Sequence, residues 1–201
     1  MSHSCFNEFN EDGGCHDHSG HGGHHGHDHD HSHDNEEVLK DSLFSKVNID
    51  QVRCMNEKVK DSIKGIFKPW DERMDTTKFV DSDADEQLIV HIPFTGQVKL
   101  KSIIIRGGPD GMSPNQMKVF VNRPDIDFDT VESEKPVQHW SLVNAPNQAQ
   151  PVEYNTNVMK FRQVTNLTLY FPNCFSGDVT RLLFLAFKGE WLPVSTCYQR
   201  N

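Results

Sequence analysis

The stretches "LIVHIPF" (88–94) and "VKLKSIIIRG" (98–107) decide the fold class of this chain of 201 residues. Every second residue of the first stretch is large and apolar, which is typical of a β-strand with one buried face. The alternation places His91 on the opposite face, so we expect this side chain to be exposed. The intervening residues 95–97 include a glycine and predict a turn, so the simplest interpretation is a β-hairpin.

Further short strands are predicted downstream, separated by Gly, Pro and Asn residues. They are 116–124, 138–143, 151–156, 159–164, 166–172 and 181–191. The apolar residues from Glu36 onward have mixed spacing and predict one or two short helical turns before the first strand. Short strands without crossover helices indicate an all-β fold, an antiparallel jelly-roll-like β-sandwich.

The N-terminal part of the chain differs sharply in composition from the rest. Residues 1–37 hold ten of the twelve histidines and nine of the 29 acidic residues, and no Lys or Arg. This segment therefore carries the whole formal charge of −9, and the remainder is balanced at 20 positive against 20 negative residues. So few apolar residues cannot offset the entropy of ordering a chain. We predict a disordered His/Asp/Gly-rich tail at 1–37 and a folded domain at 38–201.

Several function classes are disfavoured by composition. The neutral domain has no net basic field to attract nucleic acid or an anionic membrane surface. The sequence shows neither a signal peptide nor an apolar run long enough for a membrane span. The five cysteines are odd in number and include no Cys-x-x-Cys pair, which fits reduced thiols. We expect a soluble, non-secreted monomer.

The histidines of the tail are candidate metal ligands. Alternating imidazoles on a flexible chain can bind zinc, nickel or copper. The candidates are His24, His25, His27, His29, His31 and His33. Structural metal sites usually have fixed loops and further hydrogen bonds that orient the ligands, and this tract predicts neither. Adventitious binding is the simpler interpretation, so we expect no cofactor.

An acidic stretch precedes the first predicted strand. Asp81, Asp83 and Asp85 occupy positions 1, 3 and 5 of a calcium-loop pattern. The pattern fails at positions 6 and 12, where Glu86 and Ile92 replace the glycine and glutamate of an EF-hand. Local turn hydrogen bonds are the simpler explanation. The alternatives are a calcium site of another loop design and contact with a basic patch of a partner protein.

The aromatic stretch "GIFKPWDER" (65–73) has two interpretations. Exposed Phe67 and Trp70 around Lys68 would anchor a partner protein, because aromatic residues dominate interface hot spots. Folded back, the same rings would cover the open end of the sandwich, and we favour this second interpretation.

Motifs of the common catalytic classes do not occur in the sequence. It contains no Gly-x-Ser-x-Gly elbow, no phosphate-binding Gly-x-x-x-x-Gly-Lys-[Ser/Thr] loop and no His-Glu-x-x-His helix. We therefore predict no catalytic residues and no enzymatic activity.

The region from about 45 to 198 resembles the PITH domain family, whose name abbreviates "proteasome-interacting thioredoxin". The resemblance rests on "PFTGQVKLKSIII" (93–105), "KVFVNRPDIDFD" (118–129) and "FKGEW" (187–191). The chain is similar to the stand-alone form of the domain, without an attached thioredoxin. The resemblance implies a galactose-binding-like jelly roll, a location in cytoplasm and nucleus, and association with the regulatory particle of the proteasome.

Three functional hypotheses follow. The first is a non-enzymatic interaction module that binds the proteasome regulatory particle and so affects protein turnover and gene expression. The second is a metal-handling protein that uses the tail to bind zinc, nickel or copper. The third, carbohydrate binding, rests only on fold analogy.

Overall fold

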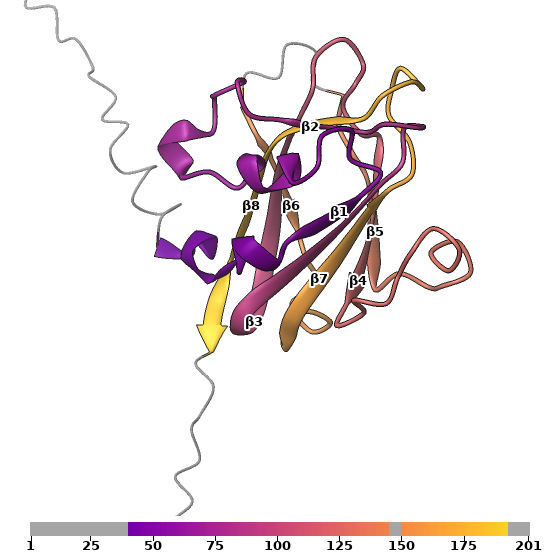
Figure 1. Cartoon of the computed structure of the whole chain (residues 1–201). Helices are drawn as coiled ribbons and strands as arrows, with labels where there is room; N and C mark the ends of the chain where they lie inside the picture. Colours follow the sequence, from indigo (N-terminus) through magenta and orange to yellow (C-terminus); the bar gives the residue numbers. More distant parts are fainter. Residues whose placement is uncertain (1–39, 145–149, 193–201) are drawn as a thin grey trace, which may run out of the picture. The chain divides into compact units, whose positions relative to one another are not determined.

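The computed structural model describes residues 40–144 and 150–192. In this part short 3₁₀ helices accompany strands whose pairings are all antiparallel (Figure 1). The strands are β1 (Arg53–Met55), β2 (Val80–Asp81), β3 (Leu88–Gly107), β4 (Gln116–Val121), β5 (Gln138–Ser141), β6 (Val152–Asn155), β7 (Val164–Phe171) and β8 (Arg181–Leu192). The 3₁₀ helices are η1 (Phe44–Lys46), η2 (Ile49–Gln51), η3 (Ser62–Ile66) and η4 (Trp70–Glu72). The described helices include none long and apolar enough to cross a membrane.

The predicted jelly-roll-like β-sandwich is confirmed. One layer has the strand order β1–β3–β7–β4–β5 and the other has β6–β3–β8–β2. The helical turns expected before the first strand are η1 and η2. Apolar side chains from both layers meet in one core, which includes Leu88, Val90, Ile92, Ile103, Ile105, Leu169, Phe171, Leu185 and Phe187.

β3 belongs to both layers, and the predicted hairpin is therefore wrong. Its first half pairs with β1 and β7, and its second half pairs with β6 and β8. The pairing register shifts between Pro93 and Val98, where the strand bends near its label in Figure 1. Because both halves send apolar side chains into the same core, they face each other across the sandwich and do not pair.

Gly96 explains why the turn signal was misleading. Its φ is not among the positive values found at Gly111 and Gly177, so the chain makes no glycine-dependent tight turn there. A Cβ at position 96 would instead lie 2.7 Å from Nε1 of Trp191 on β8. The glycine permits a close approach of the indole, which is a packing role inside a bent strand.

A loop at 122–137 covers the outer face of the first layer. It completes a second apolar cluster of Ile89, Phe120, Ile126, Val131 and Tyr170. The first half of β3 is consequently buried on both faces, and the expectation of an exposed His91 is wrong: its side chain is 6% exposed. A period of two identifies the core-facing residues but carries no information about a loop that covers the other face.

The strand predicted at 159–164 is also wrong, except for its last residue. β7 begins at Val164, and the preceding residues form turns. Phe161 is fully buried within those turns, and its carbonyl accepts a hydrogen bond of 2.9 Å from the backbone N–H of Leu100. The sequence predicted a strand here because a turn that buries a single aromatic residue has a composition similar to that of a short strand.

Candidate functional site

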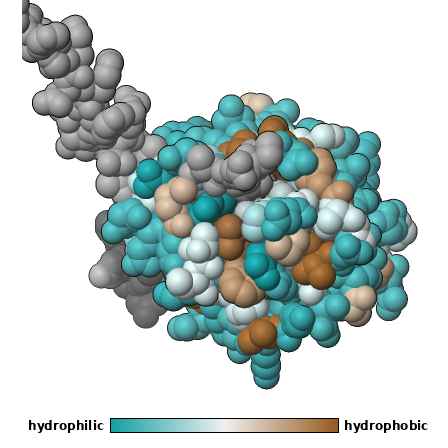
Figure 2. Space-filling view, turned by 90° about the horizontal axis from the view of Figure 1, so that it is seen from above, coloured by the Kyte–Doolittle hydropathy of each residue, from teal (hydrophilic) through white to brown (hydrophobic). Residues whose placement is uncertain are grey.

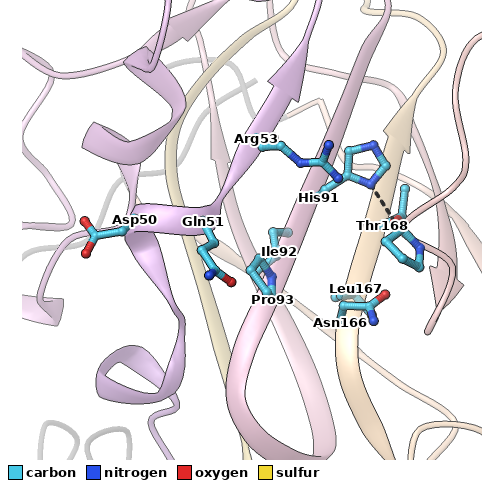
Figure 3. Close-up of a pocket in the computed structure, with 10 residues that line it drawn as sticks. Asp50, Gln51, Arg53, His91, Ile92, Pro93, Asn166, Leu167 and Thr168 are labelled. Atoms are coloured by element: carbon cyan, nitrogen blue, oxygen red, sulfur yellow. Dashed lines mark hydrogen bonds between the residues drawn. The ribbon is translucent and has the colours of Figure 1, made fainter.

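A pocket of about 460 Å³ opens on the outer face of the first layer (Figure 3). β1 and η2 supply one wall, β3 the floor and β7 the other wall, with Pro124 of the covering loop beside them. Its polar lining residues are Asp50, Gln51, Arg53, His91, Asn166 and Thr168.

Strand register places the central polar residues in one row. Arg53 of β1 lies opposite His91 of β3, and His91 lies opposite Thr168 of β7. Residues directly opposite each other in an antiparallel pair point to the same face. The neighbouring Ile92 and Leu167 point into the core, so the row faces outward into the pocket.

His91 is held in place by a buried hydrogen bond. Its Nδ1 lies 3.0 Å from Oγ1 of Thr168, and that hydroxyl donates to the carbonyl of Arg123 at 2.8 Å. The pKa of His91 is lowered from 6.5, first because burial disfavours the charged imidazolium and second because of the positive charge of Arg53. Asp125 and Asp127 act in the opposite direction. The imidazole is therefore neutral at pH 7.

This lowered pKa predicts a pH-dependent stability. Below pH 6.5 the unfolded chain binds a proton at His91 that the folded domain resists, so the free energy of unfolding should fall as pH falls from about 6.5 to 5. One such group contributes a slope of at most about 1.4 kcal/mol per pH unit. Urea unfolding at several pH values should show a flatter dependence for His91→Asn, which has no titratable group, and an unchanged slope would contradict the assignment.

Arg53 presents an uncompensated positive charge at the pocket. Within residues 40–144 and 150–192 its guanidinium forms no ion pair and donates no hydrogen bond, and the residue is exposed. Two other arginines of the domain have carboxylate partners: Arg123 binds Asp125 and Glu134, and Arg181 binds Asp81 through two hydrogen bonds of 2.6 and 2.7 Å. Asp50 lines the same pocket, but its side chain points away from Arg53 in Figure 3.

Asn166 supplies an acceptor with no described partner. Its Oδ1 is buried and receives no hydrogen bond within the described part of the chain, while its Nδ2 donates to Oγ1 of Thr165 at 3.4 Å. Asn166 pairs with Pro93 on β3, a residue without a backbone N–H. An unsatisfied buried acceptor costs about 1–3 kcal/mol, so a donor placed there by a ligand would be favourable.

The acidic residues predicted to bind a partner lie elsewhere, around β2. Asp81 is half-buried in its pair with Arg181, whereas Asp83 and Asp85 are exposed. Asp85 accepts hydrogen bonds from Nδ2 of Asn56 at 2.8 Å and from the backbone N–H of Gln87 at 3.0 Å. No group of three or more potential metal-ligating His, Cys, Asp or Glu residues occurs in the described part. Of the two bonds to Asp85, only the one from Gln87 is a local turn hydrogen bond of the kind that the simpler interpretation predicts.

The aromatic stretch folds back onto the sandwich. Phe67 is buried, with its ring centroid 6.3 Å from that of Phe187, and Trp70 packs edge-on against Phe184 at 6.0 Å. Lys68 is only 3% exposed. Phe67 and Lys68 are therefore not available as surface contacts, and the half-buried Trp70 presents only part of its ring.

Apolar side chains are exposed around the loops that precede β2 and β8. Phe79 and Phe175 are 36% and 39% exposed, and the guanidinium of Arg181 lies 4.1 Å from the Phe79 ring centroid. The backbone N–H groups of Phe175 and Arg181 both bond to the 107–115 loop, at Ser113 and Met112. We call the surface around β2 and these loops the loop end, and Figure 2, seen from above, shows apolar patches between hydrophilic ones.

Comparison with known proteins identifies the family. The model of the PITH domain matches residues 33–199. The chain belongs to the PITH domain family. A PITH domain-containing protein of Drosophila melanogaster is 41% identical over 177 residues, covering 88% of this chain and 82% of that protein. Human PITH domain-containing protein 1 is 38% identical over 176 residues, with the same shares covered.

Solved structures agree on the fold of this PITH domain. The CBM32-1 and CBM32-2 domains of Clostridium perfringens ZmpB, solved with GalNAc, match with a TM-score of 0.57 at 12% identity, over 78% of this chain and 38% of that one. The family 32 CBM of C. perfringens NanJ, solved with galactose, matches with 0.53 at 7% identity, over 73% and 96%. The predicted galactose-binding-like architecture is confirmed, and at these identities the likeness shows the fold alone.

Sequence reasoning for this PITH domain missed most of the pocket. It did not bring Arg53, Asn166 and Thr168 together with His91, because their proximity depends on strand pairing between distant segments. The candidate metal ligands His24, His25, His27, His29, His31 and His33 lie outside the described residues. Their role stays a prediction.

Proposed function

We propose that this PITH domain protein is a non-enzymatic protein-interaction module that associates with the regulatory particle of the proteasome. Membership of the PITH family carries this proposal. In this proposal the protein acts as a monomer in cytoplasm and nucleus, requires no cofactor, and affects protein turnover and through it gene expression. The metal-handling alternative rests on the tail, and no described residue favours it.

The loop end is the surface that best suits such an association. It combines the partly exposed rings of Phe79 and Phe175 with the exposed carboxylates of Asp83 and Asp85. Partly buried aromatic residues beside charged ones are typical of interface hot spots. A partner surface with an apolar centre and basic rim would complement it.

The direct test is affinity purification of the full chain from cell lysate under reducing conditions, followed by crosslinking and mass spectrometry. We expect proteasome regulatory-particle subunits in the recovered material, crosslinked near the loop end. Recovery without those subunits would contradict the proposal. Crosslinks confined to another face would retain the association but exclude this surface.

Replacing both Phe79 and Phe175 by alanine should reduce recovery of the regulatory particle at least about tenfold, because each hot-spot ring contributes more than about 1 kcal/mol. Met159→Ala is the matched control, since Met159 is 72% exposed in the turn before β7, away from the loop end. Thermal unfolding should first verify that both variants are folded. Equal recovery of the double variant and the control would exclude the aromatic contacts.

A further inference from the structure

We propose that the pocket between Arg53 and Asn166 binds an acidic residue of a peptide. The carboxylate would lie on the guanidinium of Arg53, and a backbone N–H of the same peptide would donate to Oδ1 of Asn166. This inference goes beyond the proposed function, because the pocket lies on the outer face of the first layer and not at the loop end.

The charge balance around the pocket favours a single negative charge. Of the nearby carboxylates, Asp125 accepts three hydrogen bonds from Arg123 and Asp127 accepts two from Thr130. Asp50 also lines the pocket, but its carboxylate points away from Arg53 in Figure 3. His91 is neutral at pH 7 because burial and Arg53 lower its pKa. Arg53 is thus the one unpaired cation among the described lining residues. A guanidinium binds carboxylates bidentately, with geometry fixed by its planar fork.

The second polar feature of the pocket, Oδ1 of Asn166, requires a hydrogen-bond donor. A peptide offers such a donor and a simple anion does not. Oδ1 of Asn166 is buried and has no hydrogen-bond partner among the described residues, while its Nδ2 donates to Oγ1 of Thr165 at 3.4 Å. An acidic residue in a peptide offers both a carboxylate and backbone N–H groups. Inorganic phosphate at neutral pH would bring a second charge toward Asp125 and Asp127, which makes it a poorer fit.

The apolar lining suits the remainder of such a residue. Pro93 and Pro124 lie beside the polar row and supply its apolar lining. The methylene groups of a glutamate side chain would contact these residues while its carboxylate reaches Arg53. Apolar surroundings also reduce the competition from water for the ion pair.

The test is an NMR titration of the full chain with short peptides, observing the side-chain signals of Arg53 and Asn166. The probes are N-acetylated, C-amidated Ala-Glu-Ala and the isosteric Ala-Gln-Ala. We expect the glutamate peptide to bind at least about tenfold more tightly and to shift both signals. Equal binding of the two peptides would overturn the proposal.

Variants separate the contributions of Arg53 and Asn166 to binding, and other probes test the class of ligand. Arg53→Gln should abolish the preference for glutamate, and Asn166→Ala should weaken binding but keep that preference. Lys58→Gln is the matched control, because it removes an exposed charge near the loop end. Glutarate that binds as tightly as the peptide would overturn the peptide assignment, and tighter binding of phosphate or of galactose would overturn the ligand class. Because the probes are small molecules and short peptides, these outcomes do not depend on proteasome association.

Discussion

Replacing Gly189 by alanine is expected to destabilise the domain by more than about 3 kcal/mol, an effect larger than ordinary core overpacking. Gly189 lies on β8 opposite Leu100 of β3. A Cβ at this position would come closer than 3.0 Å to the carbonyl oxygen of Lys99. Backbone atoms of a central strand cannot move aside as a flexible side chain would, so the pairing of β3 with β8 must open.

Urea unfolding of the variant and of Gly65→Ala provides the comparison. At Gly65 a Cβ would lie 3.4 Å from Cβ of Lys78, which is ordinary contact, so this control should change the free energy of unfolding by less than about 1 kcal/mol. If both substitutions cost the same small amount, the close approach of β8 to β3 would be contradicted.

The same geometry gives a physical reason for two motifs of the family resemblance. "FKGEW" (187–191) contains Gly189, which permits the close approach of β8 to β3, and Trp191, which packs over Gly96. Gly96 belongs to "PFTGQV" (93–98), the bend of β3. The motifs are therefore two halves of one contact, made where β3 passes from the first layer to the second.

The fold class was predictable from sequence because alternation and turn residues are local properties. Strand partners were not, because pairing depends on segments far apart in the chain. The bend at 94–97 was consequently interpreted as a hairpin, although its glycine serves packing against Trp191. Burial of His91 depends likewise on a loop that lies more than 30 residues downstream at 122–137.

The pocket was less predictable than the fold for the same reason. His91 and Thr168 are 77 residues apart, and only the register of β3 with β7 brings them together. Arg53 has no motif that would distinguish it from other exposed arginines. By contrast, the covering role of the aromatic stretch followed from the local composition, since Phe67 and Trp70 have large apolar rings that favour burial.

Lys68 illustrates a further feature that sequence could not indicate, a buried cation with a structural role. Residues 67–79 cross the domain with few regular backbone pairings, so their carbonyls need other donors. Nζ of Lys68 donates to the carbonyls of Asp75 at 2.7 Å and Lys78 at 3.2 Å, and it lies 3.5 Å from the Asp75 carboxylate. Arg106 donates from β3 to the carbonyl of Met74 at 2.9 Å. Lys68 thus connects distant parts of this segment, and Arg106 holds the segment on the sandwich.

Lys68→Ala should therefore lower the free energy of unfolding by about 3 kcal/mol, because it removes a buried charge from its partners and leaves carbonyls without donors. Lys68→Met keeps most of the apolar stem but has no donor, so its free energy of unfolding should fall less than that of Lys68→Ala. Lys78→Ala is the control at an exposed position and should change the free energy of unfolding by less than about 1 kcal/mol. Release of the segment should also accelerate trypsin cleavage after Arg73 in Lys68→Ala relative to the Lys78→Ala control. Equal stability and equal cleavage rates for these two variants would show that the Lys68 ammonium does not hold the segment.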